Sequence, residues 1–325
     1  MIVRRDGEAD HVYPHSVVAI GIFDGLHRGH QEIVGMVTDL ARQHGSLAVV
    51  ATFDPHPAEI LDPVGAPLLL GTLDQRLEGL AGLGVEMARV LTFDHALAAQ
   101  SAEEFVQRVL VDELHAQVVV VGEDFRFGHE RHGDVALLER LSATGSFSVV
   151  GAPPFGEGER WSSTAVRAAV ATGDVVSAAS MLGRPFVVRG TVIHGDARGA
   201  QLGFATANLE CNARQQLPAR GIYAGAARTP DGAWWPAATS VGTRPQFYDD
   251  ASTLVEVHLL GYSGDLYGAS LDVAFLEHLR DEAVFPDVAA LVAQIEADVA
   301  ATEARFATFS SSECSLLDWT FGQRR

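Results

Sequence analysis

The strongest chemical signal in the sequence is a short segment with three glycines and two histidines, Gly21-Ile-Phe-Asp-Gly-Leu-His-Arg-Gly-His30. It follows an apolar run and precedes a helical pattern. Glycines let a backbone approach a ligand closely, and a helix N-terminus favours negative charge. His27 and His30 can donate to phosphate oxygens, so the segment predicts a nucleoside triphosphate site. A solvated turn is the minority interpretation, and a zinc site lacks a nearby cysteine or third histidine.

A second segment, Trp161-Ser-Ser-Thr-Ala-Val-Arg167, has hydroxyls and a guanidinium at the start of another helical pattern. Ser162 or Ser163 is a natural N-cap for that helix, and capping alone would explain the serines. Hydroxyls, helix N–H groups and Arg167 can also hold a polyphosphate. The segment is a weak signal alone and a strong one together with the two histidines.

The composition restricts the chemistry that the chain can perform. Its 325 residues contain 23 basic side chains, all arginine, against 42 acidic ones, for a net charge of −19. This balance argues against binding to nucleic acid or to a membrane surface. The absence of lysine excludes a Walker A lysine and a Schiff-base lysine. Phosphate chemistry must therefore rely on histidine, arginine, backbone N–H groups and a metal ion.

The sequence features that report on location indicate a cytoplasmic protein. Cys211 and Cys314 are far apart and suggest neither a disulfide framework nor a cysteine metal site. The first ten residues are polar, without the apolar core of a signal peptide. No apolar stretch has the length of a membrane span.

The first half of the chain alternates between strand and helix patterns. Strands are predicted over 17–23, 47–53, 85–93, 117–122 and 146–150, and helices up to Gly45, over 74–83, from a capping box at Ser101 to about 115, and over 134–141. This alternation predicts a Rossmann-like parallel sheet covered on both faces.

The second half has short strand patterns separated by Gly, Pro and Asp. Strands are predicted over 186–193, 221–227, 237–241, 253–260 and 270–275, followed by a helix over 288–306. We therefore expect an antiparallel all-β barrel with a C-terminal helix. The residues after 306 show no clear pattern.

Taken in order, these motifs resemble the bacterial bifunctional riboflavin kinase/FMN adenylyltransferase family, also called FAD synthetase. The resemblance extends from about residue 16 to 306. It rests on the segment 21–30, Thr-Phe-Asp-Pro-His-Pro (52–57), Val-Gly-Glu-Asp-Phe-Arg-Phe-Gly (121–128), Ser-Ser-Thr-Ala-Val-Arg (162–167) and Leu-Gly-Arg-Pro (182–185). It implies a nucleotidyltransferase-like FMN adenylyltransferase domain at 1–185, a riboflavin kinase domain at 186–307 and a tail of unknown role at 308–325.

The family implies roles for residues of the first domain. ATP would lie over His27 and His30, with Ser163, Thr164 and Arg167 at its phosphates. FMN would attack the α-phosphorus in line and release pyrophosphate, with Mg²⁺, His and Arg neutralising charge. The predicted catalytic residues of this half are His27, His30 and Arg167. The other predicted contacts are Gly21, Phe23, Asp24 and Gly29 for ATP, and Asp124 and Phe125 for the flavin.

The second domain contains the segment 190–208, and the family places ATP and Mg²⁺ at the end of it. Gly190 and Gly195 would contact ATP, and Thr206 and Asn208 would bind the metal, although an ordinary turn also explains these last two residues. Glu256 would be the general base for the ribityl 5′-hydroxyl; an isolated strand glutamate is otherwise usually solvated.

Two further expectations concern the kinase half. Strand alternation places Glu256 on one face with Leu254 and His258, and Val255, Val257 and Leu259 on the other. The family implies that Arg280 contacts the flavin.

Two departures from the family pattern leave an alternative open. Ala200 and Ala205 stand where the family usually has Arg and Pro. The main hypothesis is a bifunctional enzyme with ATP, riboflavin and FMN as small-molecule partners. The alternative is a specialised paralogue with FMN adenylyltransferase activity and a weakened or altered-substrate kinase half. A quiet flavin-binding protein, or a nucleotidyltransferase for another substrate such as pantetheine phosphate, explains fewer of the motifs. The sequence sets no oligomeric state.

Overall fold

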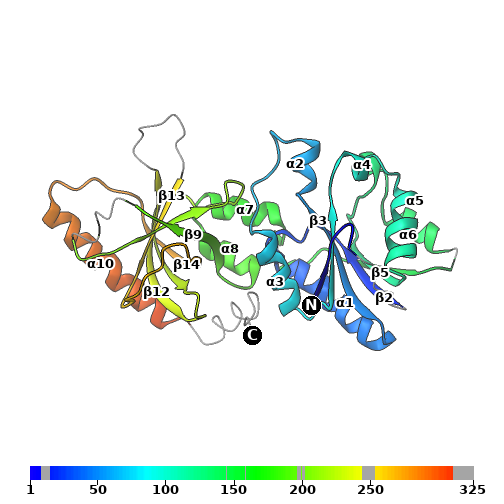
Figure 1. Cartoon of the computed structure of the whole chain (residues 1–325), viewed down its shortest axis with the longest axis horizontal. Coiled ribbons are helices and arrows are strands. Elements are labelled where there is room, and N and C mark those ends of the chain that lie inside the picture. Colours follow the sequence, from blue (N-terminus) through cyan, green and yellow to red (C-terminus); the bar gives the residue numbers. More distant parts are fainter. Residues whose placement is uncertain are drawn as a thin grey trace. The chain divides into compact units, whose positions relative to one another are not determined.

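The chain forms two compact units in a computed structural model that describes residues 1–8, 15–143, 145–157, 159–195, 199, 202–243 and 253–309 (Figure 1). The first unit comprises Met1–Pro67 and Leu73–Ser162. The second comprises Leu68–Thr72 and the described residues from Ser163 onward. Each unit has its own hydrophobic core.

A parallel sheet forms the centre of the first unit. Its order is β1-β4-β3-β2-β5-β6, and each described pair is parallel. The strands are β1 Ile2–Arg4, β2 Ser16–Ile20, β3 Leu47–Asp54, β4 Met87–Thr92, β5 Ala116–Gly122 and β6 Ser148–Ala152. From β2 the chain builds outward through β3 and β4, then returns to the other side of β2 with β5. The strand order therefore reverses between β2 and β5, and such a switch point is where open α/β sheets bind ligands.

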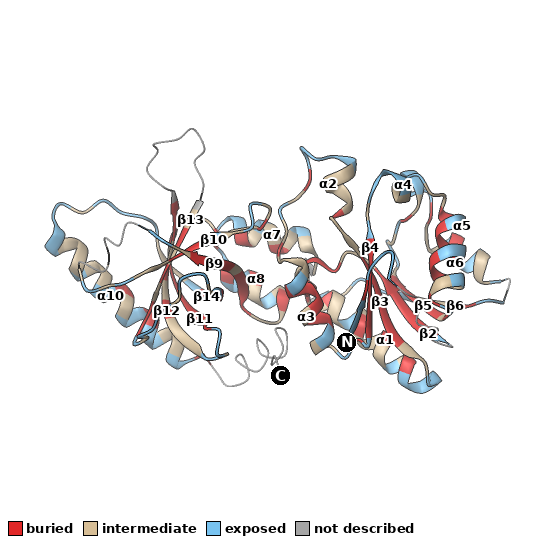
Figure 2. Ribbon diagram, in the orientation of Figure 1, coloured by how far each residue is buried: buried red, intermediate tan, exposed pale blue. Residues whose placement is uncertain are grey.

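Helices cover both faces of this sheet, as the sequence predicts (Figure 2). Val17 and Ala19 pack on the side of α1, whereas Val18 and Ile20 pack on the side of the π-helix η2 and α6. The helices are η1 Asp24–Leu26, α1 Arg28–His44, α2 Pro57–Leu61, α3 Leu73–Gly82, α4 His95–Ala98, α5 Ala102–Phe105, η2 Val106–Glu113, η3 His129–Arg131 and α6 Val135–Ser142. A short hairpin follows, β7 Gly156–Glu157 with β8 Glu159–Arg160.

The second unit is a closed antiparallel barrel with attached helices. The barrel order is β10-β13-β12-β11-β14-β9. The strands are β9 Phe186–Ile193, β10 Ala207–Cys211, β11 Gly221–Arg228, β12 Trp234–Thr243, β13 Thr253–Leu259 and β14 Ser270–Arg280, and the helices are α7 Ser163–Ala171, α8 Val175–Leu182 and α10 Val288–Ala307. The predicted barrel and closing helix are confirmed, and β10 is a strand that the sequence pattern did not predict.

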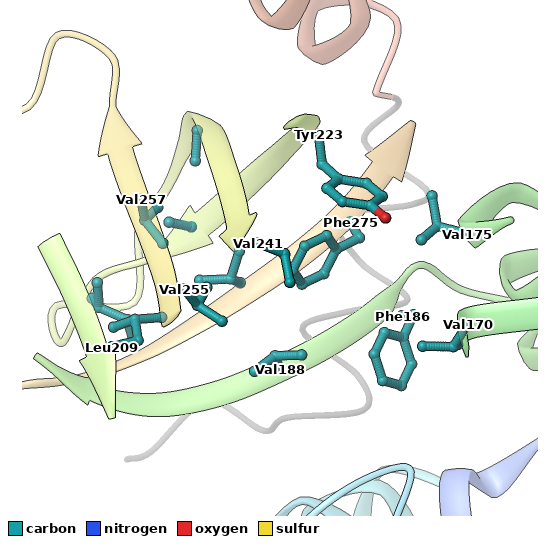
Figure 3. Packing of buried hydrophobic residues seen from close by; sticks show 14 of the residues in the cluster. Val170, Val175, Phe186, Val188, Leu209, Tyr223, Val241, Val255, Val257 and Phe275 are labelled. Atoms are coloured by element: carbon teal, nitrogen blue, oxygen red, sulfur yellow. The ribbon is translucent and has the colours of Figure 1, made fainter. Parts of the chain in front are cut away.

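Helices α7 and α8 share the core of the barrel. Val170 and Val175 belong to the same buried cluster as Phe186, Tyr223 and Phe275 (Figure 3). The compact units therefore divide at Ser162, whereas the sequence analysis places the domain boundary at residue 185. The difference is these two helices, whose apolar faces are buried against barrel strands.

None of the helices within the described ranges is long and apolar enough to cross a bilayer.

Candidate active sites

The two motif histidines lie at the carboxyl end of β2, where helix α1 begins. His27 is the N-cap of α1, and its Nδ1 accepts a hydrogen bond from the backbone N–H of His30 at 3.4 Å. The two imidazole rings are stacked, with centroids 3.7 Å apart and planes inclined by 23°. Because α1 has 17 residues, its aligned peptide dipoles place a partial positive charge of about half an elementary charge at its N-terminus. The arrangement suits an anion such as a polyphosphate.

Neighbouring residues of the motif explain how the histidines are held. A Cβ placed at Gly29 would lie 3.2 Å from the His27 ring, so the glycine lets that ring lie close to the helix. Phe23 is buried, has a left-handed φ of 54°, and meets the His30 ring edge-on at 5.1 Å. A Cβ at Gly21 would lie 3.1 Å from the Phe23 ring. These predicted ATP residues thus shape the histidine pair through packing.

A buried arginine that the sequence analysis missed links the motif to the neighbouring strand. Nη1 of Arg76, on α3, donates to Thr52 Oγ1 at 3.1 Å and to the carbonyl oxygen of Phe53 at 3.0 Å. Thr52 Oγ1 in turn donates to the carbonyl oxygen of Ile22 at 3.1 Å. Burial lowers the pKa of Arg76, while the carboxylate of Asp24, itself buried, acts in the opposite direction. This series of hydrogen bonds holds the turn that carries the histidines in place.

The predicted flavin segment lies at the carboxyl end of β5, next to β2 in the sheet. The Phe125 N–H donates to the carbonyl oxygen of Gly122 at 2.9 Å, which forms a tight turn. The Phe125 ring stacks on buried Phe127, with centroids 5.3 Å apart and planes inclined by 14°. Asp124 is exposed. Because β2 and β5 are adjacent and parallel, this segment and the histidine pair share one edge of the sheet, at the switch point.

The other predicted phosphate residues belong to the second unit. Helix α7 begins at Ser163, which agrees with the prediction that a helix follows the two serines. Nε of Arg167 donates to the carbonyl oxygen of Leu68 at 2.6 Å, within the same unit. That Ser163, Thr164 and Arg167 meet the same ATP as the histidines stays a prediction.

A second candidate site lies on the outer face of the barrel. Register places Glu256 of β13 directly opposite Asn208 of β10. Val255 and Val257 are fully buried inside the barrel and Glu256 is half-buried on the other face, which confirms the alternation predicted from sequence. Asn208 is only 6% exposed, and its amide lies against Gly195, where a Cβ would come within 2.1 Å of Nδ2. The predicted kinase residues Gly195 and Asn208 thus lie with Glu256, which comes from a distant part of the chain.

The loop that leads into β10 is anchored to the same face. Nδ1 of His258 lies 2.7 Å from the carbonyl oxygen of Ala205, so this nitrogen must carry the proton and donate. The Phe204 ring meets the His258 ring edge-on at 5.7 Å, and the Phe204 N–H donates to the carbonyl oxygen of Gly199 at 2.9 Å. Thr206 comes directly after Ala205 and directly before β10. His258 thereby anchors the main chain beside the predicted metal ligand.

Two other predicted kinase contacts have clear packing functions. Gly190 lies within β9, where a Cβ would be 3.0 Å from the carbonyl oxygen of Glu210. The Arg280 guanidinium binds the buried Asp298 carboxylate of α10, with Nη2–Oδ2 at 2.7 Å. Its Cζ lies 5.6 Å from the Phe285 ring centroid. Their contacts with ATP and flavin stay predictions, and Ala200 lies outside the described residues.

A cavity of ≈ 570 Å³ lies at the opposite edge of the first sheet. Its lining includes His15, His44 and His115, near the amino ends of β2 and β5. It is therefore separate from the histidine pair at the carboxyl ends.

The side chains near Gly195 fit a magnesium ion rather than a softer metal. Within the described ranges, no group of three or more His, Cys, Asp or Glu side chains could hold a metal ion. Asn208 and Glu256 provide an amide and a carboxylate, and Thr206 has a hydroxyl and precedes Asn208 by two positions in the chain. Such hard oxygen donors, few in number, suit Mg²⁺, which keeps several waters and binds substrate phosphates.

An α/β unit with a stacked histidine pair at a helix N-terminus, joined to a barrel with a carboxylate–amide pair, fits the class of nucleotide-dependent transferases. Comparison with known families agrees, because the FAD synthetase family matches residues 10–165 and the riboflavin kinase family matches residues 182–306. The chain belongs to the bifunctional riboflavin kinase/FMN adenylyltransferase family.

Individual relatives are similar over nearly their whole length. The bifunctional riboflavin kinase/FMN adenylyltransferase of Pseudomonas fluorescens is 40% identical over 289 residues, which is 89% of this chain and 92% of the relative. The protein of the same name from Escherichia coli (strain K12) is 38% identical over 287 residues, or 87% and 90% of the two chains. A crystal structure described as a macrolide-efflux protein from Streptococcus pneumoniae has a TM-score of 0.84 and 32% identity, covering 93% of this chain and 99% of that one.

Proposed function

We propose that the protein phosphorylates riboflavin to FMN at the barrel and adenylylates FMN to FAD at the α/β unit. The observation that carries this proposal is that each unit assembles its own functional group of residues. Glu256 and Asn208 are register partners beside Gly195, and His27 and His30 are stacked at the switch point of the sheet. One protein can therefore perform two successive transfers.

In the kinase step, the half-buried Glu256 carboxylate accepts the proton of the ribityl 5′-hydroxyl. The hydroxyl oxygen then forms a bond to the γ-phosphorus of ATP, the bond from that phosphorus to the β-phosphate oxygen breaks, and ADP leaves. Thr206 and Asn208 would hold Mg²⁺, which neutralises charge on the phosphates when it is bound. Gly190 and Gly195 contact ATP, and Arg280 contacts the flavin ring.

In the adenylyltransferase step, a phosphate oxygen of FMN forms a bond to the α-phosphorus of ATP, and pyrophosphate leaves. Ring N–H groups of the two histidines, Nε2–H in the case of His27, donate to phosphate oxygens together with the N–H groups of α1. No side chain forms a covalent intermediate. We assign the remaining contacts as follows: Ser163, Thr164 and Arg167 to the phosphates, Gly21, Phe23, Asp24 and Gly29 to ATP, and Asp124 and Phe125 to FMN.

The proposal also defines the surroundings of the protein. Its partners are ATP, riboflavin and FMN, and we assign it to the cytoplasm. The net charge of −19 disfavours nucleic acid as a further partner.

A product assay tests both activities. The purified protein is incubated with riboflavin, ATP and Mg²⁺, and separately with FMN, ATP and Mg²⁺, and the flavins are separated by chromatography. We expect FAD in both reactions. FAD from FMN alone would instead support the paralogue with an altered kinase half.

Two variants separate the active sites. Glu256→Gln should reduce riboflavin phosphorylation by about 10²- to 10⁴-fold, the usual contribution of a general base, and leave FAD formation from FMN unchanged. His27→Asn should reduce FAD formation from FMN and leave riboflavin phosphorylation unchanged, because asparagine retains the helix cap but lacks the imidazole. Riboflavin phosphorylation at the wild-type rate by Glu256→Gln would refute the kinase assignment.

A further inference from the structure

Trp161 packs against the first turn of α1, which carries the two histidines. The Cζ atom of Arg28 lies 5.5 Å from the centroid of the Trp161 ring. A Cβ placed at Gly29 would lie 3.8 Å from the Trp161 carbonyl oxygen, so the main chain also approaches the helix closely. The Trp161 N–H donates to the carbonyl oxygen of Phe155 at 3.0 Å, which fixes the tryptophan in place. All four residues belong to the first unit.

Arg28 is the one basic residue between His27 and His30, in a chain whose basic side chains are all arginine. Within the described residues, its guanidinium has no ion pair or hydrogen bond, and its polar contact is the face of Trp161. Arg280 differs, because its guanidinium is bound to the Asp298 carboxylate. A guanidinium held by an aromatic face keeps its edge N–H groups available for phosphate oxygens.

The aromatic contact has a clear energetic function. A free arginine side chain loses rotamer entropy when it is fixed on a ligand. A ring that already restrains the guanidinium reduces this loss, which is the usual benefit of preorganisation. The helix N-terminus alone attracts an anion without selecting its position, whereas a restrained guanidinium adds directed donors.

We propose that Trp161 is a positioning residue for adenylyl transfer: its ring holds Arg28 beside the histidine pair, and Arg28 binds the triphosphate of ATP. The inference rests on the proposed adenylyltransferase function and adds two residues to it. It predicts that Trp161 acts on ATP affinity through Arg28, with little effect on the transfer step itself.

The test measures KM for ATP in FAD formation from FMN for four variants: Trp161→Leu, Trp161→Phe, Arg28→Gln and the Trp161→Leu/Arg28→Gln double variant. We expect Trp161→Leu and Arg28→Gln each to raise this KM about 3- to 10-fold, with kcat changed less than about two-fold. Trp161→Phe should retain most of the wild-type affinity, because a benzene ring still offers a face. The double variant should have the same KM for ATP as Arg28→Gln, because both substitutions remove the same interaction.

Two controls separate the proposed effect from general damage. KM for ATP in riboflavin phosphorylation, measured on the same samples, should stay at the wild-type value. Trp235→Leu, which removes a half-buried tryptophan that contacts Tyr262 in the barrel, should leave the adenylyltransferase KM unchanged.

Several results would overturn the inference. The first is a wild-type KM for ATP in Arg28→Gln. The second is a double variant in which the increases in KM from the two single substitutions add up. The third is a KM in Trp161→Phe as high as in Trp161→Leu. Arg28→Gln changes a half-buried side chain on a helix surface, so it decides the matter even if Trp161→Leu does not fold. Failure of the wild-type protein to make FAD from FMN would refute the proposed function itself, which is a different outcome.

Discussion

Replacing Gly195 by alanine tests whether the kinase site depends on the position of the Asn208 amide. A Cβ at residue 195 would lie 2.1 Å from Nδ2, 2.5 Å from Cγ and 2.8 Å from Oδ1 of Asn208. Gly195 does not have a positive φ, so alanine causes no backbone strain of its own. The substitution therefore acts only through the steric clash between the new Cβ and the Asn208 side chain.

The distances give the expected size of the effect. Normal contact requires the amide to move by at least about 1 Å, and a displacement of that size in an active site lowers the rate about 10²-fold. Gly195 is itself exposed, so the crowding falls on the buried Asn208 side chain. Overpacking of a buried group typically costs about 1–3 kcal/mol, and tenfold in rate corresponds to about 1.4 kcal/mol. We therefore expect kcat/KM for riboflavin phosphorylation to fall about 10- to 100-fold in Gly195→Ala.

The assay follows FMN formation from riboflavin and, with the same protein, FAD formation from FMN, which should not change. Gly35→Ala is a matched control because a Cβ at Gly35 has no neighbour within 4 Å and the residue lies inside α1. It should retain both activities and be slightly more stable, by up to about 1 kcal/mol. Adding Asn208→Ala to Gly195→Ala should restore the stability and leave the kinase inactive.

Wild-type kinase activity in Gly195→Ala would refute the reasoning. It would mean that Asn208 can move without consequence and that its amide does not bind ATP or the metal. Equal loss of both activities would also contradict it, because the collision lies entirely within the barrel unit.

Three further predictions follow from contacts within the two units. His258→Leu should raise KM for ATP in the kinase step about fivefold, because the loop before β10 loses one hydrogen bond, while FAD formation from FMN should not change. Burial acts to raise the pKa of Asp6, but hydrogen bonds from Arg89 and the main chain outweigh it and hold that pKa below its ordinary value. Asp6 therefore stabilises the fold at neutral pH, and this contribution is lost as the pH falls through the lowered pKa of its carboxyl. The urea midpoints of wild type and Asp6→Asn should differ at pH 7 and come closer together in acid; a gap that widens in acid would contradict this. Asp298→Asn should lower the melting temperature by several degrees, because the Arg280 guanidinium loses its buried charge partner, and an unchanged thermal transition would refute that role.

Features set by neighbouring residues in the chain were predictable from sequence. The capping box at Ser101 and Glu104 is present, and Gly45 ends α1 in the left-handed conformation. The alternation along β13 correctly separated Glu256 from the buried valines. Each of these depends on local spacing, where the physical rule acts over a few residues.

Features that depend on distant partners were not predictable. Asn208 lies in β10, a strand of weak β propensity whose pairing with β9 and β13 closes the barrel. Arg76 lies on a predicted helix, but nothing in the pattern shows that it reaches Thr52. Residues 106–113 form a π-helix where the periodicity predicted an ordinary helix. The partner of Arg280 is Asp298, on another element.

The anchor between His258 and residue 205 has a consequence for how such chains evolve. The acceptor is a main-chain carbonyl oxygen, which every amino acid provides, including the proline that the family usually has at this position. Exchanging proline for alanine therefore leaves the attachment of the loop intact. Substitutions at position 205 are tolerated because the hydrogen bond comes from a histidine 53 residues away and does not depend on the side chain at 205. A consensus search that requires the proline would therefore reject a chain in which the loop is still held in place.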